Sequence, residues 1–172
     1  MSEAHDNLVA IAAEWLKAQR CSVVLTELPT SALERPDAIG WQATQSILVE
    51  CKVTRADFRA DAAKLFRLAP ENGVGLVRYF LTPPGLIRVE ELSAKWGLLE
   101  WDGTRVRRVR KSEWHAVDNR QEIALLLSAV KRIGVNCPEG ISVRCYTMRS
   151  GNRSTLGVES LEESALLDGD GI

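Results

Sequence analysis

Residues 47–52 read Ile47-Leu48-Val49-Glu50-Cys51-Lys52, and Asp37 lies thirteen positions before Glu50, directly after a proline. The apolar run Ile47-Leu48-Val49 predicts a buried strand. Side chains alternate between the faces of a strand, so Glu50 and Lys52 share one face and Cys51 takes the other. Ionisable side chains at the end of a buried strand cost desolvation energy that a packing role would not require. Two carboxylates and a lysine that converge there can hold a divalent metal and an activated water.

Hydrophobic periodicity predicts the order helix-strand-strand-strand-helix-strand around this motif. The first helix has one apolar stripe, made by Leu8, Ile11, Ala12, Trp15 and Leu16. The second helix begins at a capping Thr54 and ends before Pro70. In residue ranges, we expect a helix at 2–19, strands at 21–28, 37–41 and 46–53, a helix at 54–69 and a strand at 76–82.

The second half of the chain predicts further elements beyond this core. The dipeptide Asp102-Gly103 is a strong hairpin signal between two β-rich runs. A long amphipathic helix follows, and a last hairpin is expected around Ser150-Gly151-Asn152. In residue ranges, these elements are a short helix at 88–95, strands at 97–101 and 104–110, a helix at 119–133 and strands at 141–147 and 155–159.

Composition indicates one soluble domain. The chain has 172 residues, of which 45% are apolar and 26% charged. No apolar run approaches the ~20 residues that a membrane-spanning helix needs, and the first residues show no signal-peptide pattern, so we expect a cytoplasmic protein without a membrane partner. The four cysteines lack the paired spacing of a zinc or iron–sulfur site, which favours reduced and mostly buried thiols.

The net charge of −1 conceals a basic body and an acidic end. Residues 154–172 contain five acidic side chains and no lysine or arginine, although the whole chain has 22 basic residues. The densest basic segment spans residues 104–111, with five cations and no acid. Like charges on a strand repel unless something neutralises them, and phosphate groups would do so. Cations on an edge strand also discourage aggregation, and that protective role is an equally strong alternative.

The motif resembles the signature of the PD-(D/E)XK nuclease superfamily. Residues 50–61, Glu-Cys-Lys-Val-Thr-Arg-Ala-Asp-Phe-Arg-Ala-Asp, also resemble the strand-to-helix passage of MmcB-type DNA-repair proteins, and this similarity extends over residues 5–110. The resemblance implies an α/β fold with a restriction-endonuclease-like core (αβββαβ), in which helices flank a mixed central sheet, plus a C-terminal helix and hairpin. Residues 1–150 would form the nuclease-like domain, and residues 151–172 an acidic tail that is partly ordered as a strand.

The same resemblance implies a Mg²⁺- or Mn²⁺-dependent deoxyribonuclease that acts in repair, recombination or a mobile element. Asp37 and Glu50 would bind the metal with the backbone carbonyl of Cys51, and Lys52 would orient the water and stabilise charge on the phosphate. Some members have an additional acid on the first helix, for which Glu14 is the candidate. Glu34, in the loop two residues before Pro36, is a similar candidate.

Nucleic acid is the partner that these residues predict. We expect the nucleic acid to be DNA, and the sequence leaves RNA open as an alternative. With one metal site per chain, a homodimer would be needed to cut both strands of a duplex. The candidate phosphate contacts lie on the second helix and the basic strand: Arg55, Arg59, Arg105, Arg107, Arg108, Arg110 and Lys111. Strict alternation places Arg108 and Arg110 on one face of an edge strand, with Val109 opposite. The five tryptophans are expected in the core rather than as base-stacking surfaces.

Three alternatives remain open from the sequence. Glu50 and Lys52 could form only a surface salt bridge. The chain could be a nucleic-acid-binding module that keeps the triad but does not cleave. It could also be an α/β protein of unrelated function whose basic strand binds an acidic protein.

Overall fold

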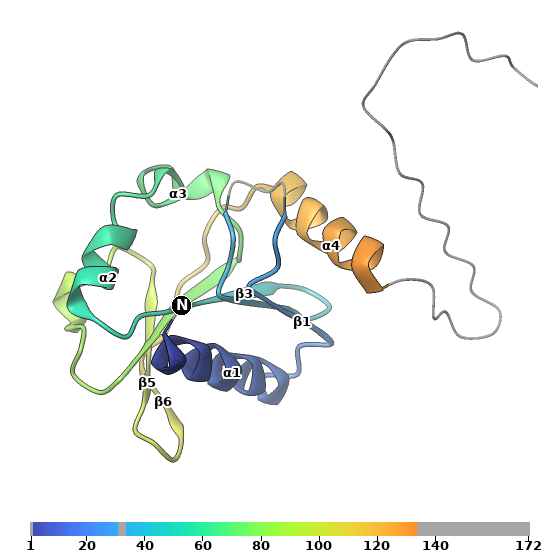
Figure 1. Ribbon diagram of the computed structural model, residues 1–172. Helices are drawn as coiled ribbons and strands as arrows, with labels where there is room; N and C mark the ends of the chain where they lie inside the picture. The colour runs from blue at the N-terminus through green and yellow to red at the C-terminus, as the bar shows by residue number, and fades with distance from the viewer. Residues whose placement is uncertain (1, 31–33, 134–172) are drawn as a thin grey trace, which may run out of the picture.

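A computed structural model describes residues 2–30 and 34–133 of the chain (Figure 1). The first six predicted elements occur in the expected order. The helices and strands are α1 (Glu3–Ala18), β1 (Val23–Thr26), β2 (Ala38–Trp41), β3 (Ser46–Cys51), α2 (Arg55–Asp61), α3 (Leu65–Leu68), β4 (Val77–Thr82), β5 (Gly97–Trp101), β6 (Val106–Arg110) and α4 (Asn119–Ile133). Two single 3₁₀ turns, η1 (Pro70–Asn72) and η2 (Val89–Glu91), complete the described part, and η2 stands where a short helix was expected.

The strands form one mixed sheet in the spatial order β1-β2-β3-β4-β5-β6. The pairs β3–β4 and β4–β5 are parallel. The pairs β1–β2, β2–β3 and β5–β6 are antiparallel. The predicted hairpins at β2–β3 and β5–β6 are therefore confirmed. All residues of β3 and β4 are buried, as expected for central parallel strands.

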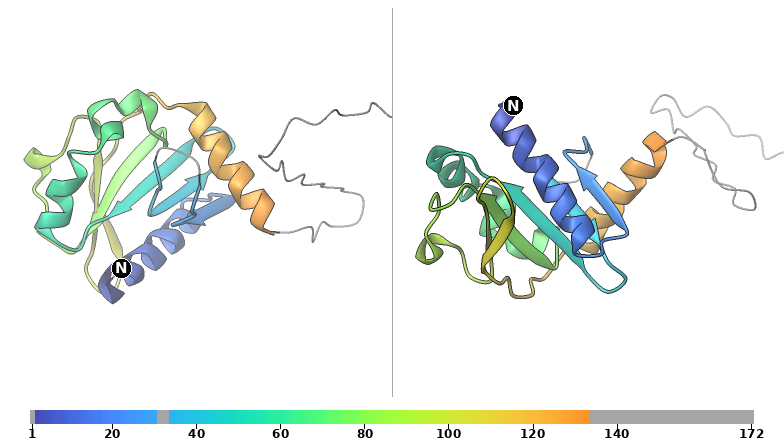
Figure 2. Two further views of the ribbon diagram at one scale, coloured as in Figure 1. Left: turned by 45° about the horizontal axis from the view of Figure 1, so that its top comes forward. Right: turned by 90° about the horizontal axis from the view of Figure 1, so that it is seen from below.

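Helices cover both faces of the sheet (Figures 1 and 2). Helix α1 packs on one face, where Leu8, Ala12 and Leu16 join Val49 and Leu81 in one core cluster. The other face carries a second cluster, to which α2 and α4 contribute Phe58 and Leu125. The alternation predicted for β3 is confirmed, because Cys51 belongs to the α1 cluster while Glu50 contacts Lys52. No helix in the described ranges has the length and apolar character required to cross a membrane.

The single helix expected over residues 54–69 is wrong. Helix α2 ends at Asp61, and the separate turn of α3 begins at Leu65. The break lets the Arg67 guanidinium bond to the Asp61 carboxylate, with 2.6 Å between Nε and Oδ2. In a continuous helix, residues six apart are offset by ~9 Å along the axis and do not share a face, so this bond could not form.

The bulge in the β5–β6 pair corrects the predicted alternation of the basic strand. Leu98 pairs with Arg110 and Leu99 pairs with Arg108. Val109 is therefore an extra residue in β6 that has no partner between Leu98 and Leu99 of β5. Since Leu98 and Leu99 lie on opposite faces of the sheet, Arg108 and Arg110 also point to opposite faces. The expectation that β6 is an edge strand is confirmed.

A fully buried arginine holds the segments that surround the sheet. The Arg78 guanidinium, in β4, donates to the carbonyl oxygens of Gly75 and Pro70 at 2.8 Å and of Ala116 at 2.9 Å. These bonds tie the chain after α3 and the chain before α4 to the same central strand. Cys21 and Cys51 are free, buried thiols, as expected. The other two cysteines, the predicted strands 141–147 and 155–159 and the acidic tail 151–172 lie outside the described residues.

We expect Gly97→Ala to destabilise the fold severely. A Cβ atom at Gly97 would lie 2.3 Å from the Tyr79 ring and 2.8 Å from the Ser112 nitrogen, so the edge of the sheet would have to shift. The cost should be about 2–3 kcal/mol in the free energy of unfolding. Urea denaturation showing Gly97→Ala as stable as the parent protein would contradict the packing described here.

Candidate active site

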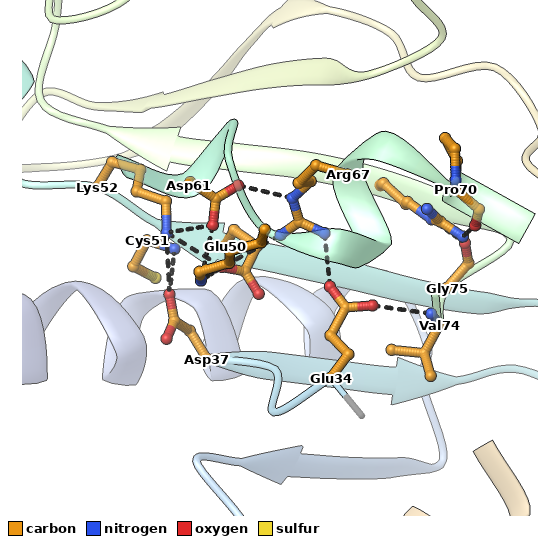
Figure 3. Close-up of polar contacts among 12 residues, drawn as sticks. Glu34, Asp37, Glu50, Cys51, Lys52, Asp61, Arg67, Pro70, Val74 and Gly75 are labelled. Carbon is orange, nitrogen blue, oxygen red and sulfur yellow. Dashed lines mark hydrogen bonds and ion pairs between the residues drawn. The ribbon is translucent and has the colours of Figure 1, made fainter. Parts of the chain in front are cut away.

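The side chains of Asp37, Glu50 and Lys52 meet at the end of β3 (Figure 3). Antiparallel pairing of Ala38 with Val49 places Asp37 beside Glu50. The Lys52 ammonium lies 3.1 Å from Glu50 Oε2 and 4.0 Å from Asp37 Oδ2. Asp37 Oδ2 also accepts a hydrogen bond of 2.8 Å from the backbone nitrogen of Cys51. The structure thus brings the predicted triad together.

Lys52 is a buried cation with a third carboxylate partner. Its side chain is only 4% exposed, and Asp61 Oδ1 lies 3.3 Å from its nitrogen. Burial alone would lower the pKa of Lys52, but the carboxylates of Glu50, Asp61 and Asp37 outweigh burial and raise this pKa above its usual value. Lys52 therefore stays protonated throughout the neutral range.

Arg67 extends this group into a network of ion pairs that sequence reasoning did not find. Its guanidinium contacts Glu34 Oε1 at 2.5 Å and Glu50 Oε2 at 3.4 Å, besides Asp61. Glu34 is fully buried and also accepts a hydrogen bond from the Val74 nitrogen. The Arg67 guanidinium lies over the Trp96 ring, 4.4 Å from its centroid. Glu34 is thus a partner of Arg67, rather than the loop acid expected at the metal.

The carboxyl groups of this network differ in their pKa values. Burial would raise the pKa of Asp61, but the charges of Arg67 and Lys52 lower it to about 2. For Asp37 the balance is reversed, because burial and the nearby Glu50 carboxylate raise its pKa to about 6 in spite of Lys52. Burial also raises the pKa of Glu34, against the opposing charge of Arg67. At Asp37, therefore, the nearby positive charge does not offset burial and the charge of Glu50.

His5 and Glu27 stand on the other side of Asp37. The His5 Nε2 atom lies 3.6 Å from Asp37 Oδ1 and 3.6 Å from Glu27 Oε1, and it is buried without a hydrogen-bond partner in the described ranges. One ligand atom from each of the three residues lies within 4.8 Å of the others, which is compatible with binding a metal ion. The sequence contains no local signal for this group, because α1 and the end of β1 meet Asp37 only in the folded chain.

Two of the predicted site residues lie elsewhere. Glu14 is 73% exposed, and its carboxylate pairs with Lys17 at 2.6 Å, so the structure does not bring this candidate ligand of the first helix to Asp37 and Glu50. The Arg55 guanidinium is bound to both carboxylate oxygens of Glu91 and to the carbonyl of Leu86. Arg55 thus holds η2 against α2, which removes it as a free phosphate contact. Arg59 is exposed, as a phosphate contact requires.

The basic strand is partly neutralised by its own hairpin. Arg107 pairs with Glu100 across the two strands at 2.6 Å, and Arg105 pairs with Asp102 at 3.6 Å. Arg110 donates to the Val89 carbonyl oxygen at 3.4 Å. The remaining two cations of the run, Arg108 and Lys111, lie on the exposed surface of the protein.

Solvent reaches this region from both faces of the sheet. A groove of 760 Å³ between α1 and the strands is lined by Asp6 and Glu27 near the His5 group and by Trp101 further away. On the other face, Asp61 and Arg67 line a smaller cleft of 270 Å³ together with Arg59. The network is therefore buried but lies beside spaces that solvent or a ligand can enter.

Comparison with known proteins gives the fold alone. No protein-family model and no curated protein matches the chain. Among solved structures, it is similar to the SPO1766 protein of unknown function from Silicibacter pomeroyi, with 24% sequence identity and a TM-score of 0.56. The match covers 79% of this chain and 93% of that one. It supports an α/β fold with a mixed six-stranded sheet.

We expect Asp37→Asn to stabilise the metal-free protein at neutral pH. Because the pKa of Asp37 is raised to about 6, this group favours the folded state when protonated, and that contribution is lost as the pH rises through 6. The amide removes the buried charge and should add about 2 kcal/mol to the free energy of unfolding near pH 7, with the gain vanishing below pH ~4.

Urea denaturation in a chelating buffer at several pH values measures this difference. Glu14→Gln, which removes an exposed carboxylate, is the control for the loss of one negative charge. An Asp37→Asn protein that is less stable than the parent at neutral pH would show that Asp37 is already balanced by Lys52 and His5.

Proposed function

We propose that this protein is a metal-dependent nuclease with a restriction-endonuclease-like core, which hydrolyses phosphodiester bonds in DNA. The observation that carries the proposal is the meeting of two carboxylates, from Asp37 and Glu50, at one buried lysine ammonium. They sit at the end of a central strand, in the helix and strand order that the resemblance to PD-(D/E)XK nucleases implies. A role in DNA repair is part of the same proposal.

The oxygen atoms present fit a hard divalent cation. Glu50 Oε1 is buried and has no hydrogen-bond partner among the described residues, and Asp37 Oδ1 faces His5 at 3.6 Å. Unsatisfied buried carboxylate oxygens are costly, and Mg²⁺ or Mn²⁺ prefers such ligands. Asp37 and Glu50, with the carbonyl of Cys51, would hold the ion. His5 and Glu27 contact Asp37 from its other side and form a separate group with it that is also compatible with a metal ion. When bound, such an ion supplies an acidified water and neutralises phosphate charge.

Lys52 acts as an electrostatic group rather than as a base. Its raised pKa keeps the ammonium protonated, so it cannot accept a proton at neutral pH. A fixed positive charge that is almost excluded from solvent is suited to stabilising negative charge that develops on a phosphoryl group. Asp61 and Arg67 support this role by holding Lys52 and Glu50 in place.

A non-cleaving nucleic-acid-binding module of the same fold is the second candidate. It is favoured by one observation: Glu50 Oε2 already lies within 4.0 Å of three cations, those of Lys52, Lys64 and Arg67. Such a carboxylate is neutralised without a metal. The two candidates differ in whether the site binds a divalent ion.

We expect the protein to nick or degrade DNA with Mg²⁺ or Mn²⁺, and Asp37→Ala, Glu50→Ala and Lys52→Ala each to reduce cleavage at least ~100-fold. Ca²⁺ should support little cleavage, because it is larger and a poorer Lewis acid. Gel assays on single-stranded, duplex, flapped and four-way DNA and on RNA measure the activity, and circular dichroism checks folding. Glu14→Gln should cleave like the parent protein.

Calorimetric titration with Mn²⁺ separates the two candidates. The nuclease proposal requires Mn²⁺ binding that Asp37→Ala removes and Glu14→Gln does not. A parent protein that binds no divalent ion and is inert on every substrate would favour the binding module.

A further inference from the structure

A polar pocket lies at the start of β3, at the opposite end of the strand from Asp37 and Glu50. It has a volume of 220 Å³ and includes Ile47, from β3, and Val77, from β4, in its lining. Typical small-molecule sites measure ~300–1,000 Å³, so this pocket fits one planar ring rather than a complete cofactor. Its polar and aromatic lining comes from α1 and its C-cap, the β2–β3 turn, β4 and the chain after β6: Trp15, Gln19, Gln42, Gln45, Tyr79, Ser112 and Trp114, with the cations described next.

Charge distinguishes this pocket from the other spaces in the protein. Arg108 and Lys111 line it, and no acidic residue does. The groove along α1, in contrast, is lined by Asp6, Glu14 and Glu27. Within residues 2–30 and 34–133, no carboxylate pairs with Arg108 or Lys111, whereas Arg105 and Arg107 are paired within the hairpin. The fold therefore places Arg108 and Lys111 at this pocket, whereas Arg110, which donates to the Val89 carbonyl oxygen, does not line it.

Trp114 presents an aromatic surface on a fixed backbone. Its side chain is 63% exposed, which corrects the expectation that all five tryptophans lie in the core. Backbone hydrogen bonds hold both neighbours, from the Glu113 nitrogen to the Lys95 oxygen at 2.9 Å and from the His115 nitrogen to the Leu76 oxygen at 2.8 Å. Trp114 itself forms a bridge with Val77. Such a residue can stack with a planar ligand at little cost in backbone entropy.

Hydrogen bonds also order the polar side of the pocket. Gln45 donates to the side chain of Gln42, which donates in turn to the Gln19 carbonyl oxygen at 2.5 Å. The Arg108 guanidinium donates to the Gln19 side-chain oxygen at 3.3 Å. This arrangement fixes amide groups next to the cations, where they can meet the hydrogen-bonding edge of a base.

We propose that this pocket binds an unpaired base of a single-stranded nucleic acid, with Trp114 stacking on the base and Arg108 and Lys111 contacting the adjacent phosphates. The proposal rests on the proposed function only in taking nucleic acid as the ligand. Aromatic stacking beside a positively charged track is the general chemistry of single-strand binding. An acidic peptide would use the two cations but would gain little from an exposed indole ring, so base stacking is the property to test.

Binding without catalysis tests the pocket. In buffer with a chelator, fluorescence anisotropy compares a labelled single-stranded DNA with an abasic strand of the same length and charge. We expect the parent protein to bind the normal strand more tightly. Trp114→Ala should weaken binding of the normal strand about tenfold and leave the abasic strand unchanged, and Trp114→Phe should restore most of the affinity.

The salt dependence tests the phosphate contacts with a matched control. The double substitution Arg108→Gln/Lys111→Gln should flatten the log–log slope of affinity against salt by about 1 to 2. Arg105→Gln/Arg107→Gln removes the same number of charges from two arginines that already have carboxylate partners, and should change the slope little. A parent protein that binds the abasic strand as tightly as the normal strand would overturn base binding.

The outcomes separate this inference from the proposed function. If Trp114→Ala and the double variant bind single strands as the parent does, while Asp37→Ala abolishes cleavage, the pocket proposal fails and the nuclease proposal stands. If Trp114→Ala loses single-strand affinity but no cleavage depends on Asp37, the pocket stands and the nuclease proposal fails.

Discussion

A buried lysine among three carboxylates is the constraint on which the arrangement of this protein depends. An ammonium group that is almost fully removed from water costs several kcal/mol unless its partners are close and well placed. Lys52 obtains these partners from three different parts of the chain: Glu50 from its own strand, Asp37 from the neighbouring strand and Asp61 from the end of α2. The β2–β3 pairing and the position of α2 are thereby coupled to one charge.

The network around this lysine contains more buried charged side chains than the stability of the fold requires. Buried ion pairs can often be replaced by apolar side chains without loss of stability. A purely structural role therefore does not account well for a cluster that adds Glu34, Asp61 and Arg67 to the triad. Its charges are also unevenly balanced, because Arg67 and Lys52 hold the pKa of Asp61 low whereas the pKa of Asp37 is raised. Strongly perturbed acids beside a solvent-accessible groove are typical of functional sites.

Local patterns in the sequence predicted the parts of the fold that depend on local rules. The two-residue period of β3 assigned Glu50 and Cys51 to opposite faces, and the Asp102-Gly103 turn predicted the second hairpin. The convergence of Asp37 with Glu50 followed from antiparallel pairing of two short strands. These features required no knowledge of distant contacts.

For features that depend on tertiary contacts, the predictions from the sequence were absent or wrong. The apolar stripe of the second helix continues through Ala62 in the sequence, but the helix ends at Asp61, where the break permits the buried Asp61–Arg67 bond. His5 reaches Asp37 from another element, which no spacing reveals. The hairpin signal at Asp102-Gly103 implied that Glu100 would face an arginine of the next strand, but a two-residue turn would pair it with Arg105, whereas the observed register pairs it with Arg107. The bulge at Val109 had no comparable signal.

Strand β3 links the two ends of the molecule because it is fixed at both. At its start, Ser46 donates to Glu122 of α4 at 2.6 Å, and the same carboxylate accepts from the Trp41 indole and the Gly75 nitrogen. At its end, the Lys52 group holds Glu50. A ligand contact near the start of the strand and a reacting group at its end would therefore keep a constant separation, since neither end can slide without breaking buried polar bonds. Under the two proposals above, a strand fixed in this way would set the distance between the bound base and the phosphate to be cut.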